Sequence, residues 1–145
     1  MQFGIYLLSS PQTTSATETG NEIGGSAIAS GNTITYGVTN TPSDLGLNFM
    51  STSVYAGIYF RNTTGNSCRY NSITSNTNLT LASTGVIFTG TNPVGISYSS
   101  TVSNNTIAIT SSGIVKVAGI DFGFGISTGT MICNNNNITF MLLNE

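Results

Sequence analysis

The chain has very little charge. Only 6% of its 145 residues are Asp, Glu, Lys or Arg, and it contains neither His nor Trp. Ordinary soluble domains carry charge on roughly a quarter of their residues. With 3 cations in all, the chain lacks the basic cluster that binds a phosphate backbone, so we expect no nucleic-acid partner. Without His, a Ser–His–Asp triad cannot be assembled.

Long hydrophobic runs are missing as well. No stretch has the length of apolar sequence that spans a bilayer, so no membrane insertion is expected. Residues 1–8 lack the basic start and full apolar centre of a signal peptide. The low charge argues against long helices, and the many β-branched and aromatic residues argue against disorder. These absences leave an all-β protein.

A short Asn–Ile pattern recurs four times along the chain. An Asn is followed two positions later by Ile in residues 32–34, 71–73, 105–107 and 136–138. Three residues before each Asn stands a small apolar residue, namely Ala29, Cys68, Val102 and Cys133. A constant register of this kind defines a structural repeat and predicts a solenoid.

Two further rows of repeats support three strands per repeat. The first comprises residues 3–7, 56–60, 94–98 and 118–122, each with Gly second and Ile third. Strand alternation directs the Ile of this row inward and the Gly to the opposite face. A weaker row is assigned to residues 46–49, 85–88 and 113–115. Three rows in fixed order predict a three-faced parallel β-helix, a β-solenoid of about four coils with loop insertions.

Stacking the coils places equivalent residues in columns about 4.8 Å apart. Two inward columns are predicted, one of Ile34, Ile73, Ile107 and Ile138 and one of Ile5, Ile58, Ile96 and Ile120. In the Asn column, each amide can donate to one neighbour and accept from the other, which satisfies buried polar groups. The predicted structural ladder is Asn32, Asn71, Asn105 and Asn136.

These repeats resemble those of the right-handed parallel β-helix, the pectate-lyase-like superfamily, as found in bacterial secreted and surface proteins. The resemblance covers nearly the whole chain. It implies the fold and the asparagine ladder. It implies no active site, because the superfamily includes lyases, hydrolases, adhesins and tail spikes.

No catalytic, cofactor or metal site is predicted. Cys68 and Cys133 occupy the same position two coils apart, about 9.6 Å, which exceeds the reach of a disulfide. Both are expected to be separate, buried, free thiols. The acids are scattered, and Asp121 is the only one on a regular strand, without an acidic neighbour in its column. Glycoside hydrolysis needs a carboxylate pair, so no enzyme is expected.

Two outward surfaces are candidates for binding. Tyr6 and Tyr59, with Asp121 in the same column, form a candidate ligand or interface face that could stack on sugar rings or fill an interface. Threonine arrays on β-solenoids resemble those of ice-binding proteins. Here the array is interrupted, because Ala108 is the equivalent of Thr35 in one repeat and Asn137 is the equivalent of Thr33 in another. Ice binding is therefore the minor alternative.

Neither end of the sequence shows a capping helix or a charged cap, and solenoids need polar caps. We therefore expect a single solenoid domain over residues 1–145 that is either a piece of a longer solenoid or a filament subunit. The leading hypothesis is a non-enzymatic extracellular or cell-surface structural module, such as an adhesin, stalk or self-assembling fibre, that forms a homo-oligomer or stacks end to end. The alternative is a carbohydrate-binding or carbohydrate-active module with a polysaccharide partner.

Overall fold

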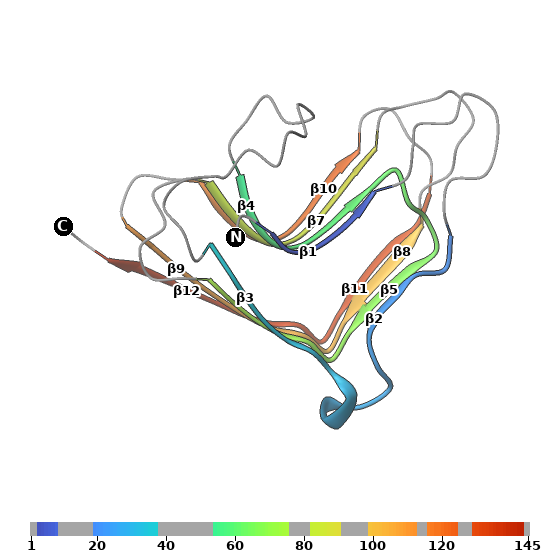
Figure 1. Cartoon of the computed structure of the whole chain (residues 1–145), viewed down its shortest axis with the longest axis horizontal. Helices are drawn as coiled ribbons and strands as arrows, with labels where there is room; N and C mark the ends of the chain where they lie inside the picture. The colour runs from blue at the N-terminus through green and yellow to red at the C-terminus, as the bar shows by residue number, and fades with distance from the viewer. Residues whose placement is uncertain are drawn as a thin grey trace.

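The computed structural model describes residues 3–8, 19–37, 54–75, 82–90, 99–112, 116–124 and 129–143. They form a three-faced parallel β-solenoid of four coils, as predicted (Figure 1). Each coil contributes one strand to each of three four-stranded sheets. Sheet 1 is made of β1 (Phe3–Leu8), β4 (Val54–Arg61), β7 (Ala82–Gly90) and β10 (Val117–Phe124).

Sheets 2 and 3 meet at a corner opposite sheet 1 (Figure 1). Sheet 2 is made of β2 (Glu22–Gly24), β5 (Asn66–Arg69), β8 (Ser100–Ser103) and β11 (Met131–Asn134). Sheet 3 is made of β3 (Thr33–Tyr36), β6 (Ser72–Ser75), β9 (Thr106–Ser112) and β12 (Asn137–Leu143). Coil 1 is therefore β1–β3, coil 2 is β4–β6, coil 3 is β7–β9 and coil 4 is β10–β12.

The register confirms one predicted column and corrects the other. Ile34, Ile73, Ile107 and Ile138 are aligned across sheet 3. In sheet 1, Ile5, Ile58 and Ile120 align with Val86, so residues 85–88 belong to the first row and the assignment of this row to residues 94–98 was wrong. Residues 94–98, 46–49 and 113–115 lie outside the described residues.

The third row of strands is also different from the prediction. Sheet 2 is formed by the short segments that directly precede each ladder Asn. Ile23, rather than Ala29, aligns with Cys68, Val102 and Cys133. Ala29 instead lies in the short 3-10 helix η1 (Ile28–Ser30), inside an insertion that separates Gly24 from Gly31. The insertion hid the true register because it shifts the spacing in coil 1 alone.

The prediction that the sheet 1 glycines face away from the core was wrong. A Cβ added at Gly85 would lie 2.5 Å from Ile107 Cγ2 and 2.6 Å from the Gly119 carbonyl oxygen, so this position faces the inside of the solenoid. The next residue, Val86, is also in the core at 0% exposure. Two successive inward positions require the strand to bend, and Figure 1 shows the strands of sheet 1 curving at their middle. Glycine recurs at this position because a side chain would clash with the inward isoleucine of sheet 3.

The core runs along the solenoid axis. Ile58, Ile73, Val86 and Ile107 are 0% exposed, and burying side chains of this size contributes about 1.5–3 kcal/mol each. An aromatic column also lies inside, in which the ring centroids of Phe60 and Phe88 are 4.5 Å apart. Because each coil buries its apolar residues against the coils on either side, the middle coils are the best packed.

Candidate functional site

The asparagine ladder is continuous through the four coils. Asn71 Oδ1 accepts hydrogen bonds from the backbone N–H and the Nδ2 of Asn32, at 3.2 and 3.0 Å. Asn105 Oδ1 accepts the same pair from Asn71, at 2.9 and 3.0 Å. Asn136 Oδ1 accepts them from Asn105, at 3.0 and 2.9 Å. The predicted ladder is therefore confirmed, and it uses the backbone N–H as well as the side-chain amide.

Each amide also fixes the preceding coil. Asn71 Nδ2 donates to the carbonyl oxygen of Ile23 at 3.0 Å, and Asn105 Nδ2 donates to that of Cys68 at 3.0 Å. Asn71 and Asn105 are 2% and 1% exposed, so these polar groups depend on one another rather than on water. The ladder is a structural element that closes the corner between sheets 2 and 3.

The residue before each ladder Asn has a left-handed backbone in coils 2 to 4. Tyr70, Asn104 and Asn135 have φ angles of 58°, 57° and 53°. Asn adopts this conformation readily, whereas a bulky residue such as Tyr pays about 1–2 kcal/mol. In coil 1, the insertion that contains η1 takes the place of this single residue. The corner is therefore left-handed at one residue in coils 2 to 4, whereas coil 1 forms it with an insertion.

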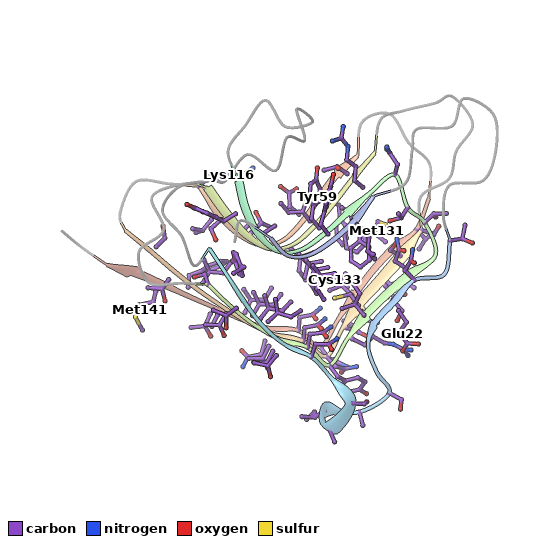
Figure 2. All side chains as sticks on the ribbon, viewed as in Figure 1. Glu22, Tyr59, Lys116, Met131, Cys133 and Met141 are labelled. Carbon is purple, nitrogen blue, oxygen red and sulfur yellow. The ribbon has the colours of Figure 1, made fainter. Side chains whose placement is uncertain are left out.

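The candidate face on sheet 1 contains the aligned residues Tyr6, Tyr59, Ile87 and Asp121. The rings of Tyr6 and Tyr59 stack with centroids 5.1 Å apart, and Figure 2 shows Tyr59 on the outer side of the sheet. Tyr59 is only 3% exposed, and burial raises the pKa of its hydroxyl, which shares a 2.9 Å hydrogen bond with Thr89. Tyr6 and Asp121 are half-buried. Binding of a ligand on this face stays a prediction.

The two described acids lie on different strands and sheets. Glu22 belongs to β2, so the expectation that Asp121 is the only acid on a regular strand was wrong. Glu22 Oε1 and Arg69 Nη2 form an exposed ion pair of 2.7 Å on sheet 2, and Lys116 Nζ lies 3.9 Å from Asp121 Oδ2 on sheet 1. The two described acids therefore occupy different sheets and do not form a carboxylate pair. Among the described residues, no group of three or more potential ligands is placed to hold a metal ion. The part of the chain that the structure covers also contains no helix able to cross a membrane.

The two cysteines lie in one column with Val102 between them, as the register predicted. Both are free thiols. Cys68 is buried, and the burial raises its pKa to about 12. The expectation that both are buried was wrong for Cys133, which is exposed. Cys133 belongs to coil 4 and is paired with Val102 of coil 3, so among the described residues its strand has a neighbour on one side (Figure 2 labels it).

Coil 4 presents an exposed apolar surface whose residues were not predicted from the sequence. Ile132, Ile138, Phe140 and Met141 are 42%, 38%, 47% and 57% exposed. β10, β11 and β12 are also the outer strands of their sheets, paired on one side alone. We call β10–β12 with these side chains the coil 4 face. In the sequence, this surface could have been recognised from the uncharged, largely apolar run of β12.

Comparison of the chain with models of protein families finds no matching family, and comparisons with curated proteins and with solved structures find no match either.

Proposed function

We propose that this chain is a non-enzymatic structural module of an adhesin or stalk outside the cell, formed by one β-solenoid domain that associates through its coil 4 face. The observation that carries the proposal is the exposure of Ile138 and Phe140. Both occupy inward positions, aligned with Ile107 and Ile109, which are 0% and 1% exposed. Exposed apolar side chains at inward positions are typical of a surface that another β-coil covers.

The backbone of the coil 4 face supports the same conclusion. A free strand edge is a template for pairing, and soluble proteins usually protect it with Lys, Pro or a bulge. β12 is 7 residues long and contains no charged residue and no Pro. β11 contains none either. An unprotected edge next to exposed core side chains favours pairing with another β-coil.

We infer that the partner is a second copy, joined through its own coil 4 face. The equivalent columns in coil 1 are already covered, since Ile23 and Ile34 are each 6% exposed and Tyr36 is 0% exposed. The β11 and β12 strands carry no charge, so two such faces meet there without charge repulsion, and two-fold symmetry makes the two β12 edges antiparallel. Contacts of this type are isologous and closed, so the expected product is a dimer and not a growing filament.

The resemblance of the repeats to the pectate-lyase-like superfamily belongs to this proposal. The Asn ladder and the three parallel sheets support it. The non-enzymatic part of the proposal has separate support. The described acids, Glu22 and Asp121, lie on separate sheets and form no carboxylate pair, which suits binding and assembly better than hydrolysis.

The test is the molar mass of the full chain by light scattering over a wide concentration range. The wild type is expected to pass from monomer to dimer and to stop there. Phe140→Lys places a charge on the coil 4 face and is expected to give monomer at every concentration. Ser67→Lys is the matched control, because Ser67 lies on the outer side of sheet 2 in coil 2, away from coil 4.

Two results would contradict the proposal. A wild type that stays monomeric at all concentrations would remove the coil 4 face as an interface. Filaments would show that the end of coil 1 also associates, which overturns the closed dimer. Equal unfolding temperatures of the two lysine variants would exclude misfolding as the cause of any difference in mass.

A further inference from the structure

The outer surface of sheet 3 carries a regular array of short polar side chains. Two columns run along the solenoid, one through each outward position that all four strands share. The register aligns Thr33, Ser72, Thr106 and Asn137 in the first column, and Thr35, Thr74, Ala108 and Thr139 in the second. We call these eight residues the hydroxyl face. All of them are exposed except Ala108, which is half-buried.

The hydroxyl face is neutral and evenly spaced. None of its eight residues is charged, and the described ion pairs lie on sheets 1 and 2. Neighbouring strands are about 4.8 Å apart, and alternate residues of one parallel strand about 6.6 Å apart. The five threonines and Ser72 therefore present hydroxyls, and the threonines methyl groups, near the points of a two-dimensional lattice. Such an array differs from an ordinary sheet surface, where charged and polar residues alternate irregularly.

The lattice is held rigidly from beneath. Between the two columns lies the inward isoleucine column, in which Ile34, Ile73 and Ile107 are 6%, 0% and 0% exposed. Along one side of the face runs the asparagine ladder, whose hydrogen bonds fix the spacing of the coils. Threonine is β-branched and has restricted χ1 freedom, so its hydroxyl and methyl keep their positions. Because these side chains are already ordered, binding to this surface costs little side-chain conformational entropy.

We propose that the hydroxyl face binds the surface of ice. Fixed hydroxyls can hold first-shell water molecules by hydrogen bonds, and the methyl groups between them restrict where those waters lie. Water molecules held at the regular spacing of these side chains can join the regular lattice of an ice crystal. The absence of charge is required, because an ion would orient its own hydration shell and break the pattern. This inference concerns the side of the solenoid and does not depend on association through the coil 4 face.

Three positions depart from threonine, and they define a gain-of-function variant. Ser72 lacks the methyl group, Ala108 lacks the hydroxyl, and Asn137 replaces both with an amide. Changing the three together to Thr completes both columns on strands that already contain Thr. The triple variant is expected to bind ice more strongly than the wild type.

The experiment follows the growth of a single ice crystal in a cooled droplet of the purified full chain. The wild type is expected to shape the crystal and to hold the freezing point below the melting point. Thr74→Lys, in the middle of the hydroxyl face, is expected to abolish this gap. Thr101→Lys, on the outer side of sheet 2, is expected to leave it unchanged. The triple Thr variant is expected to widen the gap.

Sedimentation with insoluble cellulose or chitin forms the second arm. If Thr74→Lys abolished binding to the polysaccharide while no variant affected ice, the face would be a carbohydrate site and the proposal would be overturned. An ice gap absent from both the wild type and the triple variant would overturn it too. So would equal loss in Thr74→Lys and Thr101→Lys. Thermal unfolding of every variant separates loss of binding from loss of fold.

Discussion

Coils 1 and 4 place similar residues at the same positions and bury them very differently. Ile34 in coil 1 is 6% exposed, whereas Ile138, in the same column, is 38% exposed. At the next inward position of sheet 3, Tyr36 is 0% and Phe140 is 47% exposed. In sheet 2, Ile23 is buried and the aligned Cys133 is exposed.

The difference shows how burial arises in a solenoid. Each coil contacts only its neighbours, so stability is close to a sum of coil and interface terms. A residue of constant type in a column therefore contributes according to what covers it on both sides. Identical substitutions in a middle coil and in coil 4 should differ in cost, and the following experiments use this contrast.

The largest effect is expected from the ladder. Asn105→Ala leaves the buried backbone N–H and Nδ2 of Asn71 without their acceptor and the Cys68 carbonyl without its donor. Each unsatisfied buried group costs about 1–3 kcal/mol, so a loss of about 3–5 kcal/mol in the free energy of unfolding is expected. Urea denaturation of the full chain measures it.

Asn136→Ala is the matched variant in coil 4. It removes the acceptor of the Asn105 amide, but Asn136 is itself only half-buried, so water can replace the lost oxygen. A cost of about 1 kcal/mol is expected. Equal costs for the two substitutions would contradict the idea that coil 4 is open to solvent.

The second contrast concerns two glycines of sheet 1. In Gly85→Ala the new Cβ meets Ile107 Cγ2 at 2.5 Å and the Gly119 carbonyl oxygen at 2.6 Å, and the backbone cannot move aside easily. In Gly119→Ala the Cβ meets side-chain atoms of Ile138 alone, the nearest at 2.6 Å, and this side chain is partly exposed. Overpacking costs about 1–3 kcal/mol, and we expect Gly85→Ala at the upper end and Gly119→Ala below the lower.

Denaturation by urea again gives both values. The double variant Gly119→Ala/Ile138→Ala should be no less stable than Ile138→Ala alone, because truncation of Ile138 removes the side-chain atoms that the new Cβ would meet. A large cost of Gly119→Ala in the Ile138→Ala background would show that the clash lies elsewhere.

The free energy of unfolding should fall at high pH because of two buried groups, Tyr36 and Cys68. Burial raises the pKa of Tyr36 from 10.0 to about 12, and that of Cys68 from 9.0 to about 12. Below the unfolded pKa both groups are protonated in either state and stability is constant. Above pH 9 the unfolded chain loses protons that the folded chain keeps, so stability falls until about pH 12.

Unfolding free energies measured from pH 7 upward test this. Cys68→Val, which copies Val102 of the next coil, should start its decline nearer pH 10, where Tyr36 begins to matter. The rate of labelling by a thiol reagent at neutral pH measures directly how well each cysteine is buried. Cys133 is exposed and should react quickly, whereas Cys68 should react only on unfolding. Equal labelling rates would contradict the burial of Cys68.

The smallest effect, and a stabilising one, is expected from Tyr70→Asn. Asn104 and Asn135 hold the same left-handed corner in coils 3 and 4 with φ of 57° and 53°. Replacing the half-buried Tyr70 by Asn should relieve strain and raise the free energy of unfolding by about 1 kcal/mol. The reverse substitution, Asn104→Tyr, should lower it by a similar amount. Destabilisation by Tyr70→Asn would show that packing of the Tyr70 ring outweighs the backbone strain.

Much of the fold could be predicted because solenoid repeats are local and periodic. The Asn–Ile repeat fixed the ladder and the column beneath the hydroxyl face, and the separation of Cys68 from Cys133 followed from the same register. The prediction failed where length varied between repeats. The insertion in coil 1 hid Ile23, and the strand at residues 85–88 was assigned to the wrong row.

The candidate surfaces were only partly predictable. The outward position of Tyr6 and Tyr59 followed from strand alternation, but the near-complete burial of Tyr59 did not. The bend at Gly85 reverses the expected alternation because two successive residues face inward. Alternation describes a straight strand, and a bend is decided by what packs against it.

The sequence by itself determined which residues stack along the ladder and in the isoleucine column of sheet 3, because a period that repeats Asn and Ile in one register allows only one parallel alignment. It did not determine the stacking in sheet 1 or the coil 1 strand of sheet 2. The tertiary structure alone decided how deeply each of them is buried. That depends on whether another coil covers it, as it does for Ile107 but not for Ile138. The alignment of a column is set by the repeat in the sequence, whereas the burial of its members requires a neighbouring coil on both sides.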